Sequence, residues 1–557
     1  MGTYLNPSKN DFEEAINSEI YVDKTEMLYY LNKVVKTKKK YVSVSRPRRF
    51  GKTTTVDMLC AYYSCTSENR DLFENLKISG ISPDTNKPEQ TWDRYLGSFD
   101  VIRLVMTRFF KKNISVSESL SKLQCLVSRE IKQAYPDKDY YNEADLIQTL
   151  DDAYSEKKKQ IVIVIDEWDA VFRARPDDNE GQTEYLDFLR DLMKDNNNIA
   201  LAYMTGILPI KKYGQHSALN MFTEYSMMFP RELARFTGFT EDEVSELCSS
   251  YGRDFENIRS WYDGYDVSDI IPPDPGHSEL KATGKSPEAK RYSLYSPLSV
   301  VEAVTTGVIK NYWNKTETYE ALAEYIRKDY DGLKDAVALL MDGGRVEIDT
   351  STYQNDMTTF SGRDDILSLL VHLGYLGFDD VKSEVFIPNR EILDEFRTST
   401  KSSEWITTFE SFRISQELLK ATWESDEIRV AELLEKAHNR TESKTYNSEA
   451  ALSYAIQYAY YAAQKYYTTI QELATGKGYA DIIYLPSPKY PDKPALLIEL
   501  KYNKDAVTAV EQIKNKQYPE KLEHYKGNIL VVGINYDKDA PSDSPDFKHH
   551  SCKIERA

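Results

Sequence analysis

The sequence KYVSVSRPRRFGKTT, residues 40–54, decides the fold of the first part of the chain. Residues 40–45 show the period-two pattern of a strand, and the apolar residues between 56 and 63 recur at helical spacing. RPRRFGKTT, called here the 46–54 loop, therefore joins a strand to a helix through a tight turn. A Gly-Lys-Thr sequence in that position is typical of loops whose backbone amides bind phosphate.

The residue types in the 46–54 loop suit a nucleotide with a magnesium ion. Gly51 lets backbone amides approach an anion, Lys52 reaches the outer phosphates, and Thr53 offers its hydroxyl to Mg²⁺. The common pattern GxxxxGK[ST] would place a glycine at position 46, where this chain has Arg46. The loop must therefore fold without the conformational freedom of that glycine. From the pattern alone, both a nucleotide site and an ordinary loop are possible.

A second motif, IVIVIDEWD at 161–169, supports the nucleotide site. A continuous aliphatic run that ends in acids is typical of a buried parallel strand. Carboxylates at the carboxyl end of such a strand lie where α/β sheets bind ligands, so Asp166 is expected to hold Mg²⁺ and Glu167 to polarise an attacking water. The alternative is a strand that simply leaves the core.

Two more runs predict further strands of the same sheet. They are FDVIRLVM at 99–106 and IALAYMTG at 199–206, which gives four strands with helical segments between them. Thr205 ends its strand as Asp166 does, and we expect it to sense the γ-phosphate. Further along, helices are expected around 316–345 and 408–437, with a β-rich stretch at 369–389 between them.

From about residue 447 the pattern predicts a separate small α/β unit. In ALLIELKY, residues 495–502, alternation places Glu499 and Lys501 on one face of an otherwise apolar strand. Burying charge is costly unless it is paired or binds a metal. Asp481, on the preceding predicted strand, completes a set in which Asp481 and Glu499 bind Mg²⁺ and Lys501 activates water or stabilises phosphate charge. A structural ion pair on an edge strand is the alternative.

Composition excludes some classes of protein. The chain has 557 residues and a formal net charge of −18, from 71 Lys and Arg against 89 Asp and Glu, so it is not coated in positive charge for wrapping DNA. Residues 31–52 are the exception, because they carry nine basic residues and no acidic one. They are expected to serve the nucleotide and a DNA backbone, or else to form a solvated helix face.

Location and metal content are also constrained by the sequence. The longest aliphatic run, at 161–165, is too short to span a membrane, the N-terminus does not resemble a secretory signal, and five scattered cysteines fit reduced thiols. We therefore expect a cytoplasmic protein without a membrane segment. The seven histidines show no HExxH or zinc-finger spacing.

A series of motifs resembles one family in order along the chain, from Tyr21 to about Tyr518. The motifs are RPRRFGKT, IDEWDA, MTG, GFTEDEV, WYDGY, LYSPLSV, LGYLGF, IPNRE, GKGYAD and IELKY. The chain resembles AAA-like ATPases that carry a C-terminal PD-(D/E)XK nuclease-like domain. This implies an α/β fold with a P-loop NTPase parallel sheet at 1–225, a helical lid and connecting region at 226–400 with an exposed loop at 266–292, and a restriction-endonuclease-like α/β domain at 401–557.

The resemblance also implies site residues. The Walker A end falls on Gly51, Lys52 and Thr53, and the Walker B pair on Asp166 and Glu167. RPRRFGK looks like the family's own loop variant, in which Arg46, Arg48 and Arg49 are expected to contact the nucleotide. In the nuclease-like domain the family positions fall on Asp481, Glu499 and Lys501, with accessory positions at Glu472 and Gln512. Tyr479 replaces an arginine that is usual in such sequences.

The expected function is an ATP-binding, hydrolysing protein in which nucleotide state gates magnesium-dependent cleavage of nucleic acid, with DNA as the expected polymer. The cofactors are ATP and Mg²⁺. An alternative is a nucleotide-dependent switch or scaffold whose nuclease-like domain binds nucleic acid or protein without cutting. A homo-oligomer is a further expectation, with Arg231 or Arg235 reaching a neighbour's site.

Overall fold

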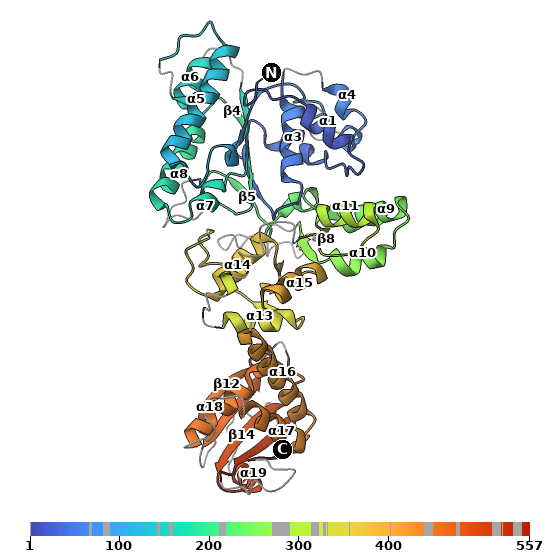
Figure 1. Ribbon diagram of the computed structural model, residues 1–557, viewed down its shortest axis with the longest axis vertical. Coiled ribbons are helices and arrows are strands. Elements are labelled where there is room, and N and C mark those ends of the chain that lie inside the picture. Colours follow the sequence, from blue (N-terminus) through green and yellow to red (C-terminus); the bar gives the residue numbers. More distant parts are fainter. Residues whose placement is uncertain are drawn as a thin grey trace, which may run out of the picture. The chain divides into compact units, whose positions relative to one another are not determined.

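The chain divides into two compact units, Met1–Ser399 and Thr400–Ala557, in a computed structural model (Figure 1). Each unit is described by itself. The structure describes residues 2–65, 69–81, 90–141, 145–154, 160–210, 219–269, 290–313, 322, 324–326, 330, 332–355, 357–400, 403–438, 449–474, 479–488, 490–514, 525, 527–538 and 549–556. No helix within these ranges is both long enough and apolar enough to cross a membrane.

The first unit begins with a five-stranded parallel sheet in the order β2-β3-β4-β1-β5. Its strands are β1 (Tyr41–Ser45), β2 (Asp100–Val105), β3 (Ile161–Asp166), β4 (Ile199–Gly206) and β5 (Thr223–Tyr225). The four strands expected from the sequence are confirmed. The fifth, β5, is only three residues long and lacks an apolar run, so its sequence gave no strand pattern.

Helices cover both faces of this sheet, with α1, α3 and α4 on one face and α5 to α8 on the other (Figure 1). Val56 and Leu59 of α3 share a core with Val42 of β1 and Val162 of β3. The helices are α1 (Asn10–Ile16), α2 (Met27–Val34), α3 (Lys52–Tyr63), α4 (Arg70–Phe73), α5 (Val116–Ala134), α6 (Leu146–Tyr154), α7 (Ala170–Ala174) and α8 (Asn179–Met193). This three-layer packing buries the strands on both faces, as their aliphatic sequences require.

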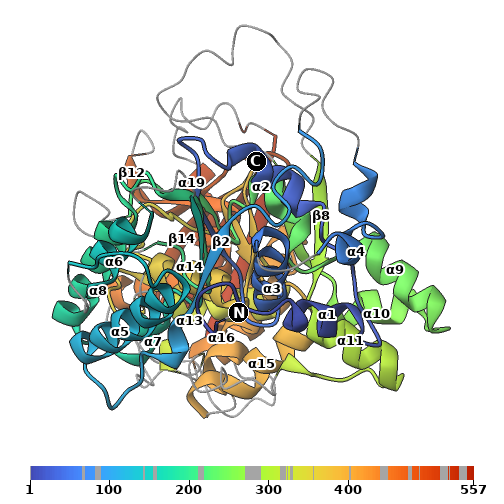
Figure 2. The same cartoon turned by 90° about the horizontal axis from the view of Figure 1, so that it is seen from above.

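The rest of the first unit is helical with two small antiparallel sheets. The helices are α9 (Glu241–Ser250), α10 (Phe255–Tyr262), α11 (Pro297–Thr306), α13 (Leu333–Met341), α14 (Arg363–Leu373) and α15 (Arg390–Ser399). The sheets have the orders β6-β8-β7 and β10-β11-β9, from β6 (Phe239–Thr240), β7 (Tyr265–Ser268), β8 (Arg291–Tyr295), β9 (Val346–Glu347), β10 (Gly377–Asp379) and β11 (Glu384–Phe386). Helices α9, α10 and α11 lie side by side (Figure 2).

Two sequence expectations in this region need correction. The exposed loop expected at 266–292 begins and ends inside strands, because Asp266 pairs with Ser293 and Ser268 with Arg291 across β7 and β8. Residues 270–289 lie outside the described part of the chain. The β-rich stretch expected at 369–389 starts as helix, since the apolar residues up to Leu373 continue the buried face of α14.

The WYDGY motif packs against the 46–54 loop. The ring of Tyr265 meets that of Phe50 edge to face, with ring centroids 5.4 Å apart, and its hydroxyl donates to the carbonyl of Gly374 over 2.5 Å. Gly264 has a φ of +134°, and a Cβ there would overlap the carbonyl oxygen of Pro388. The motif is therefore a packing element beneath the loop.

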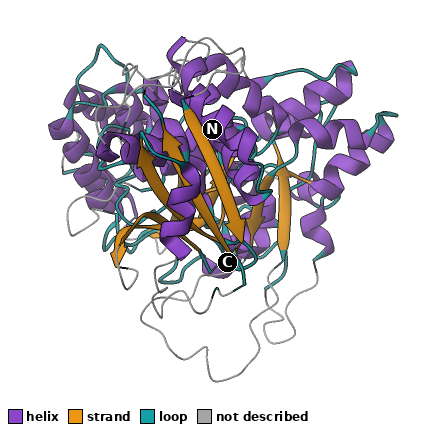
Figure 3. Ribbon diagram, turned by 90° about the horizontal axis from the view of Figure 1, so that it is seen from below, coloured by secondary structure: helices purple, strands orange, loops and turns teal. Residues whose placement is uncertain are grey.

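The second unit is built on a five-stranded mixed sheet in the order β12-β13-β14-β15-β16 (Figure 3). Its elements are α16 (Ser403–Trp423), α17 (Glu427–His438), α18 (Glu449–Ala459), β12 (Tyr467–Ala474), β13 (Tyr479–Pro486), β14 (Ala495–Tyr502), α19 (Ala506–Lys514), β15 (Ile529–Tyr536) and β16 (His550–Arg556). Among the described strands of this sheet, β14 and β15 alone pair in parallel. The edge strand β16 was not expected from the sequence.

The two faces of β14 pack against different helices, as the alternation of its sequence predicts. Leu496 and Ile498 share a core with residues of α16, α17 and α18. Leu497 packs with Val510 of α19 on the opposite face. Glu499 and Lys501 share the face of Leu497 because side chains alternate along a strand.

We expect Gly264→Ala to destabilise the first unit far more than Gly343→Ala. Both glycines have positive φ, +134° and +80°, so each alanine brings a backbone cost of roughly 1–2 kcal/mol. Gly343 has no atom within 4 Å of an added Cβ, whereas Gly264 faces Pro388. Overpacking adds roughly 1–3 kcal/mol for Gly264→Ala. Urea unfolding followed by tryptophan fluorescence measures both variants, and equal shifts of the midpoint would contradict the assigned packing.

Candidate nucleotide site and nuclease-like site

The 46–54 loop leaves open space at the amino end of α3. Gly51 has a φ of +83° and lies immediately before the helix, and among the described residues no atom outside its chain neighbours and the adjoining backbone lies within 4 Å of where its Cβ would be. Arg49 also has a positive φ, +69°. The first amides of a helix have no acceptor within the helix, and the helix dipole favours negative charge at this end, so the start of α3 suits an anion.

Lys52 lies beneath this space and is held by the loop itself. Its ammonium donates to the carbonyl oxygens of Arg46 (3.0 Å) and Pro47 (2.7 Å). Burial lowers the pKa of Lys52 to about 8, although the carboxylates of Asp169 and Asp166 act to raise it. The lysine is therefore a partly desolvated cation whose charge a bound phosphate would favour.

Thr53 and Asp166 meet although they belong to distant segments. The Thr53 hydroxyl donates to Oδ2 of Asp166 over 3.1 Å. Burial raises the pKa of Asp166, and the Thr53 hydrogen bond lowers it in part. Oδ1 of Asp166 is buried and accepts no hydrogen bond from any residue that the structure describes. A hydroxyl beside a carboxylate oxygen with spare acceptor capacity is a donor set that fits Mg²⁺.

Glu167 is positioned by two residues that sequence reasoning missed. Arg173 donates to Oε2 of Glu167 over 2.8 Å and lies 3.4 Å from Asp169. Asp169 is fully buried and accepts from the backbone amides of Ile207 and Leu208. The sequence contained a clue to Asp169, because it is the last acidic residue of the IDEWD motif. Nothing in the sequence indicated that the side chain of Arg173, one helical turn after Asp169, would contact Glu167.

The three arginines of the loop lie in different environments. Arg48 is half-buried and Arg49 is exposed. Arg46 is fully buried, its guanidinium donates to the carbonyls of Ser45 and Tyr225 over 2.8 Å each, and burial lowers its pKa to about 10. Arg46 thus ties the loop to β5 from below. Contact with a nucleotide stays a prediction for Arg48 and Arg49.

Thr205 is the penultimate residue of β4 and lies between β1 and the end of β3. Its parallel register pairs it with Val44 on one side and Asp166 on the other. Its side chain is fully buried, and its hydroxyl donates to the carbonyl of Val44 over 2.8 Å. The hydroxyl is therefore engaged within the sheet, and its role in sensing a phosphate stays a prediction.

The nuclease-like site centres on Glu499 and Lys501 of β14. The Lys501 ammonium donates to Oε1 of Glu499 over 3.1 Å, and the two residues are 6% and 2% exposed. Parallel pairing places Lys501 opposite Asn535 of β15, which is also buried. A carboxylate and an ammonium are thus held together at the carboxyl ends of two parallel strands. A carboxylate in this setting fits a hard divalent cation.

The remaining residues of the expected set are placed by their strands and helices alone. The antiparallel register pairs Ile482 with Ile498, and Asp481 directly precedes Ile482 on β13 while Glu499 directly follows Ile498 on β14. Glu472 lies on β12, which pairs with β13, and Gln512 lies on α19. The side chains of Asp481, Glu472 and Gln512 lie outside the described residues.

Comparison with known proteins agrees with both units. Residues 9–215 match the sequence model of a family described as "Predicted AAA-ATPase", and residues 449–541 match the PD-(D/E)XK nuclease superfamily. The chain is thus an α/β protein with a P-loop NTPase sheet followed by a nuclease-like domain. Residues 9–215 are thus similar to the AAA-ATPase-like family, and residues 449–541 to the PD-(D/E)XK nuclease superfamily.

One curated relative is similar over part of its length. It is an "Uncharacterized protein in vnfD 5'region" of Azotobacter chroococcum mcd 1, 24% identical over 229 residues. The similarity covers 40% of this chain and 41% of that protein, so the match spans less than half of either sequence.

We expect ATP binding to take up a proton above pH 8. The pKa of Lys52 is about 8 in the free protein, and a neighbouring phosphate raises it. The charged form of Lys52 therefore predominates below pH 8, and above pH 8 it must be generated when the phosphate binds. Affinity should then fall by up to about tenfold per pH unit above pH 8. Calorimetry at pH 8.5 in buffers of different ionisation enthalpy measures the uptake.

A lysine outside the loop provides the control. Lys194 is exposed and lies outside residues 31–52, so Lys194→Ala should bind ATP with the same proton uptake as the wild type. Heats that do not depend on the buffer at pH 8.5 would show that Lys52 does not contact the phosphates.

Proposed function

We propose that this protein binds ATP with Mg²⁺ in its first unit and couples the nucleotide state to magnesium-dependent cleavage of a nucleic-acid phosphodiester in its second unit. The observation that carries the proposal is the meeting of Lys52, Thr53 and Asp166 at the amino end of α3. The family matches of the two domains support both activities at the level of family.

The residues of the first unit have separate roles in this proposal. Thr53 and Asp166 would hold Mg²⁺, which neutralises phosphate charge when bound. Lys52 would exchange its two carbonyl acceptors for phosphate oxygens. Glu167, fixed by Arg173, would orient the attacking water, since a carboxylate can act as a base only where its position is defined.

The second unit supplies a carboxylate and a cation for phosphodiester chemistry. Asp481 and Glu499 would hold Mg²⁺, and Lys501 would stabilise the charge that develops on the phosphate. Nucleic acid, with DNA as the expected polymer, would approach through local basic residues because the chain as a whole is acidic.

One observation favours a second candidate function. The Glu499–Lys501 pair is complete as a buried ion pair, and such a pair can be retained for structure alone. The protein would then be a nucleotide-dependent switch or scaffold whose second unit binds nucleic acid or protein without cutting it.

Cleavage assays distinguish the two candidates. We expect wild-type protein to cut single- or double-stranded DNA or RNA with Mg²⁺ or Mn²⁺, at a rate that changes with ATP. Glu499→Gln should lower the rate on the order of a hundredfold or more, because it removes an ionised carboxylate from the site. The matched control is Glu511→Gln, an exposed position on α19.

A variant of the first unit tests the coupling. Lys52→Ala should abolish the rise in melting temperature that ATP causes and remove the effect of ATP on cleavage. Equal cleavage by Glu499→Gln and wild type would mean that the assigned nuclease site is wrong. Intact ATP binding without cleavage of any substrate would support the switch or scaffold.

A further inference from the structure

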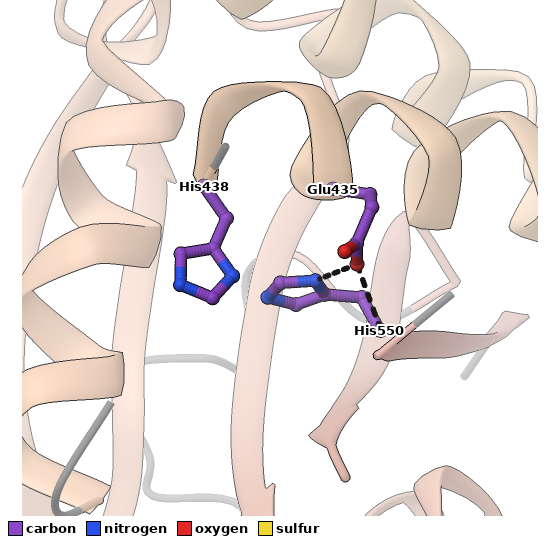
Figure 4. A group of neighbouring side chains, drawn as sticks. All are labelled: Glu435, His438 and His550. Atoms are coloured by element: carbon purple, nitrogen blue, oxygen red, sulfur yellow. Dashed lines mark hydrogen bonds and ion pairs between the residues drawn. The ribbon is translucent and has the colours of Figure 1, made fainter. Parts of the chain in front are cut away.

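A group of metal-ligating side chains lies in the second unit, apart from the Glu499–Lys501 pair. Glu435 and His438 stand three residues apart on α17, and His550 begins β16 (Figure 4). We call these three residues the histidine cluster. The chain has only seven histidines, so two buried ones beside a carboxylate are a marked concentration of this residue type.

The geometry of the histidine cluster is compact. One oxygen of Glu435 and one ring nitrogen each of His438 and His550 lie within 4.8 Å of one another. Nδ1 of His550 is 2.7 Å from Oε2 of Glu435. Both histidines are 3% exposed, and Figure 4 shows the two rings beneath the last turns of α17 with the Glu435 carboxylate beside His550.

Aromatic rings enclose the cluster on the side of β15. The ring of Tyr536 lies 5.3 Å from that of His438 and 5.1 Å from that of His550, measured between centroids. The neighbouring His549 stacks on Tyr536, with an interplanar angle of 18°. An apolar wall of this kind limits water and strengthens electrostatic interactions with an ion.

The cluster is distinct from the nuclease-like site. The buried face of α17 packs, through Leu433 and Leu434, on the side of the sheet that carries Leu496 and Ile498. Glu499 lies on the other side of β14, with Leu497 and α19. The ligand types also differ, since imidazole nitrogens favour zinc-like ions and carboxylates alone favour Mg²⁺.

We propose that Glu435, His438 and His550 bind one divalent transition-metal ion of the zinc type. Two imidazoles and a carboxylate are a known kind of donor set for such an ion, with a fourth position left for water or a further ligand. Bonds of about 2.0–2.2 Å put tetrahedral ligand atoms roughly 3.3–3.6 Å apart. Donor atoms that now lie up to 4.8 Å apart would therefore approach one another, and Nδ1 of His550 would move slightly away from Oε2 of Glu435, which is 2.7 Å distant. The ion would fasten α17 to the edge strand β16, and the proposal does not depend on the proposed function.

A clamp without metal is the competing explanation. Oε2 of Glu435 also accepts from the backbone amides of His549 and His550, over 3.0 and 3.3 Å. These bonds alone can hold the start of β16 against α17. The Nδ1 atoms of His549 and His550 add to this clamp, at 3.1 and 2.7 Å from the Glu435 carboxylate oxygens, whereas a bound metal would also use His438 as a ligand.

The test compares metal binding by the full chain and by two variants. Wild-type protein, freed of metal with a chelator and kept in excess Mg²⁺, is titrated with CoCl2 and with ZnCl2. We expect one ion per chain, a cobalt spectrum in the visible range that indicates four-coordination, and a melting temperature of the second unit that rises with zinc. His438→Gln should weaken binding by at least about a hundredfold and remove the zinc-dependent rise.

A matched control comes from the same helix and strand. Glu427, the first residue of α17, accepts from the backbone amide of Ile554 over 2.9 Å and pairs with Lys553 over 3.0 Å, but it is not in the cluster. Glu427→Gln should lower the melting temperature in chelator and keep the full response to zinc. The proposal is overturned if wild type and His438→Gln bind cobalt equally, or if zinc shifts neither melting temperature.

Discussion

Parallel pairing of β1, β4 and β3 brings the carboxyl ends of three strands that are distant in the sequence next to one another. Val44 lies opposite Thr205, and Thr205 lies opposite Asp166. The loop after β1 therefore starts beside the acids that end β3, and the hydroxyl of Thr53 reaches Asp166. A shift of one residue in either pairing would point these side chains to the opposite face, so the candidate nucleotide site depends on this register.

Buried charge is the second constraint on the first unit. Removing Lys52 and Arg46 from water favours their neutral forms, and the surrounding carbonyl oxygens compensate only in part. A loop that uses arginine in place of glycine at position 46 therefore gains an anchor to β5 at the cost of desolvating a cation. The same desolvation favours the binding of an anion, because the negative charge of a phosphate beside Lys52 would stabilise the protonated form of the lysine.

The sequence predicted those elements whose hydrophobic pattern is local and regular. Alternation and aliphatic runs predicted β1, β3 and the two faces of β14. They could not predict that the side chain of Arg46 is buried, that Arg173 contacts Glu167, or that a strand, β16, follows a segment rich in polar residues. These features are set by contacts between segments distant in the chain, as is the meeting of His438 with β16, and no local periodicity records them.

The strand order also constrains how the protein can fold as it is synthesised. β1 pairs only with β4 and β5, which end at Gly206 and Tyr225, so it emerges long before either partner exists. Until then its apolar face and both of its hydrogen-bonding edges lack their native cover. Such long-range pairing is slow and exposes a chain to aggregation. Of the five strands, the one that precedes the candidate nucleotide site thus waits longest during synthesis for a partner in the sheet.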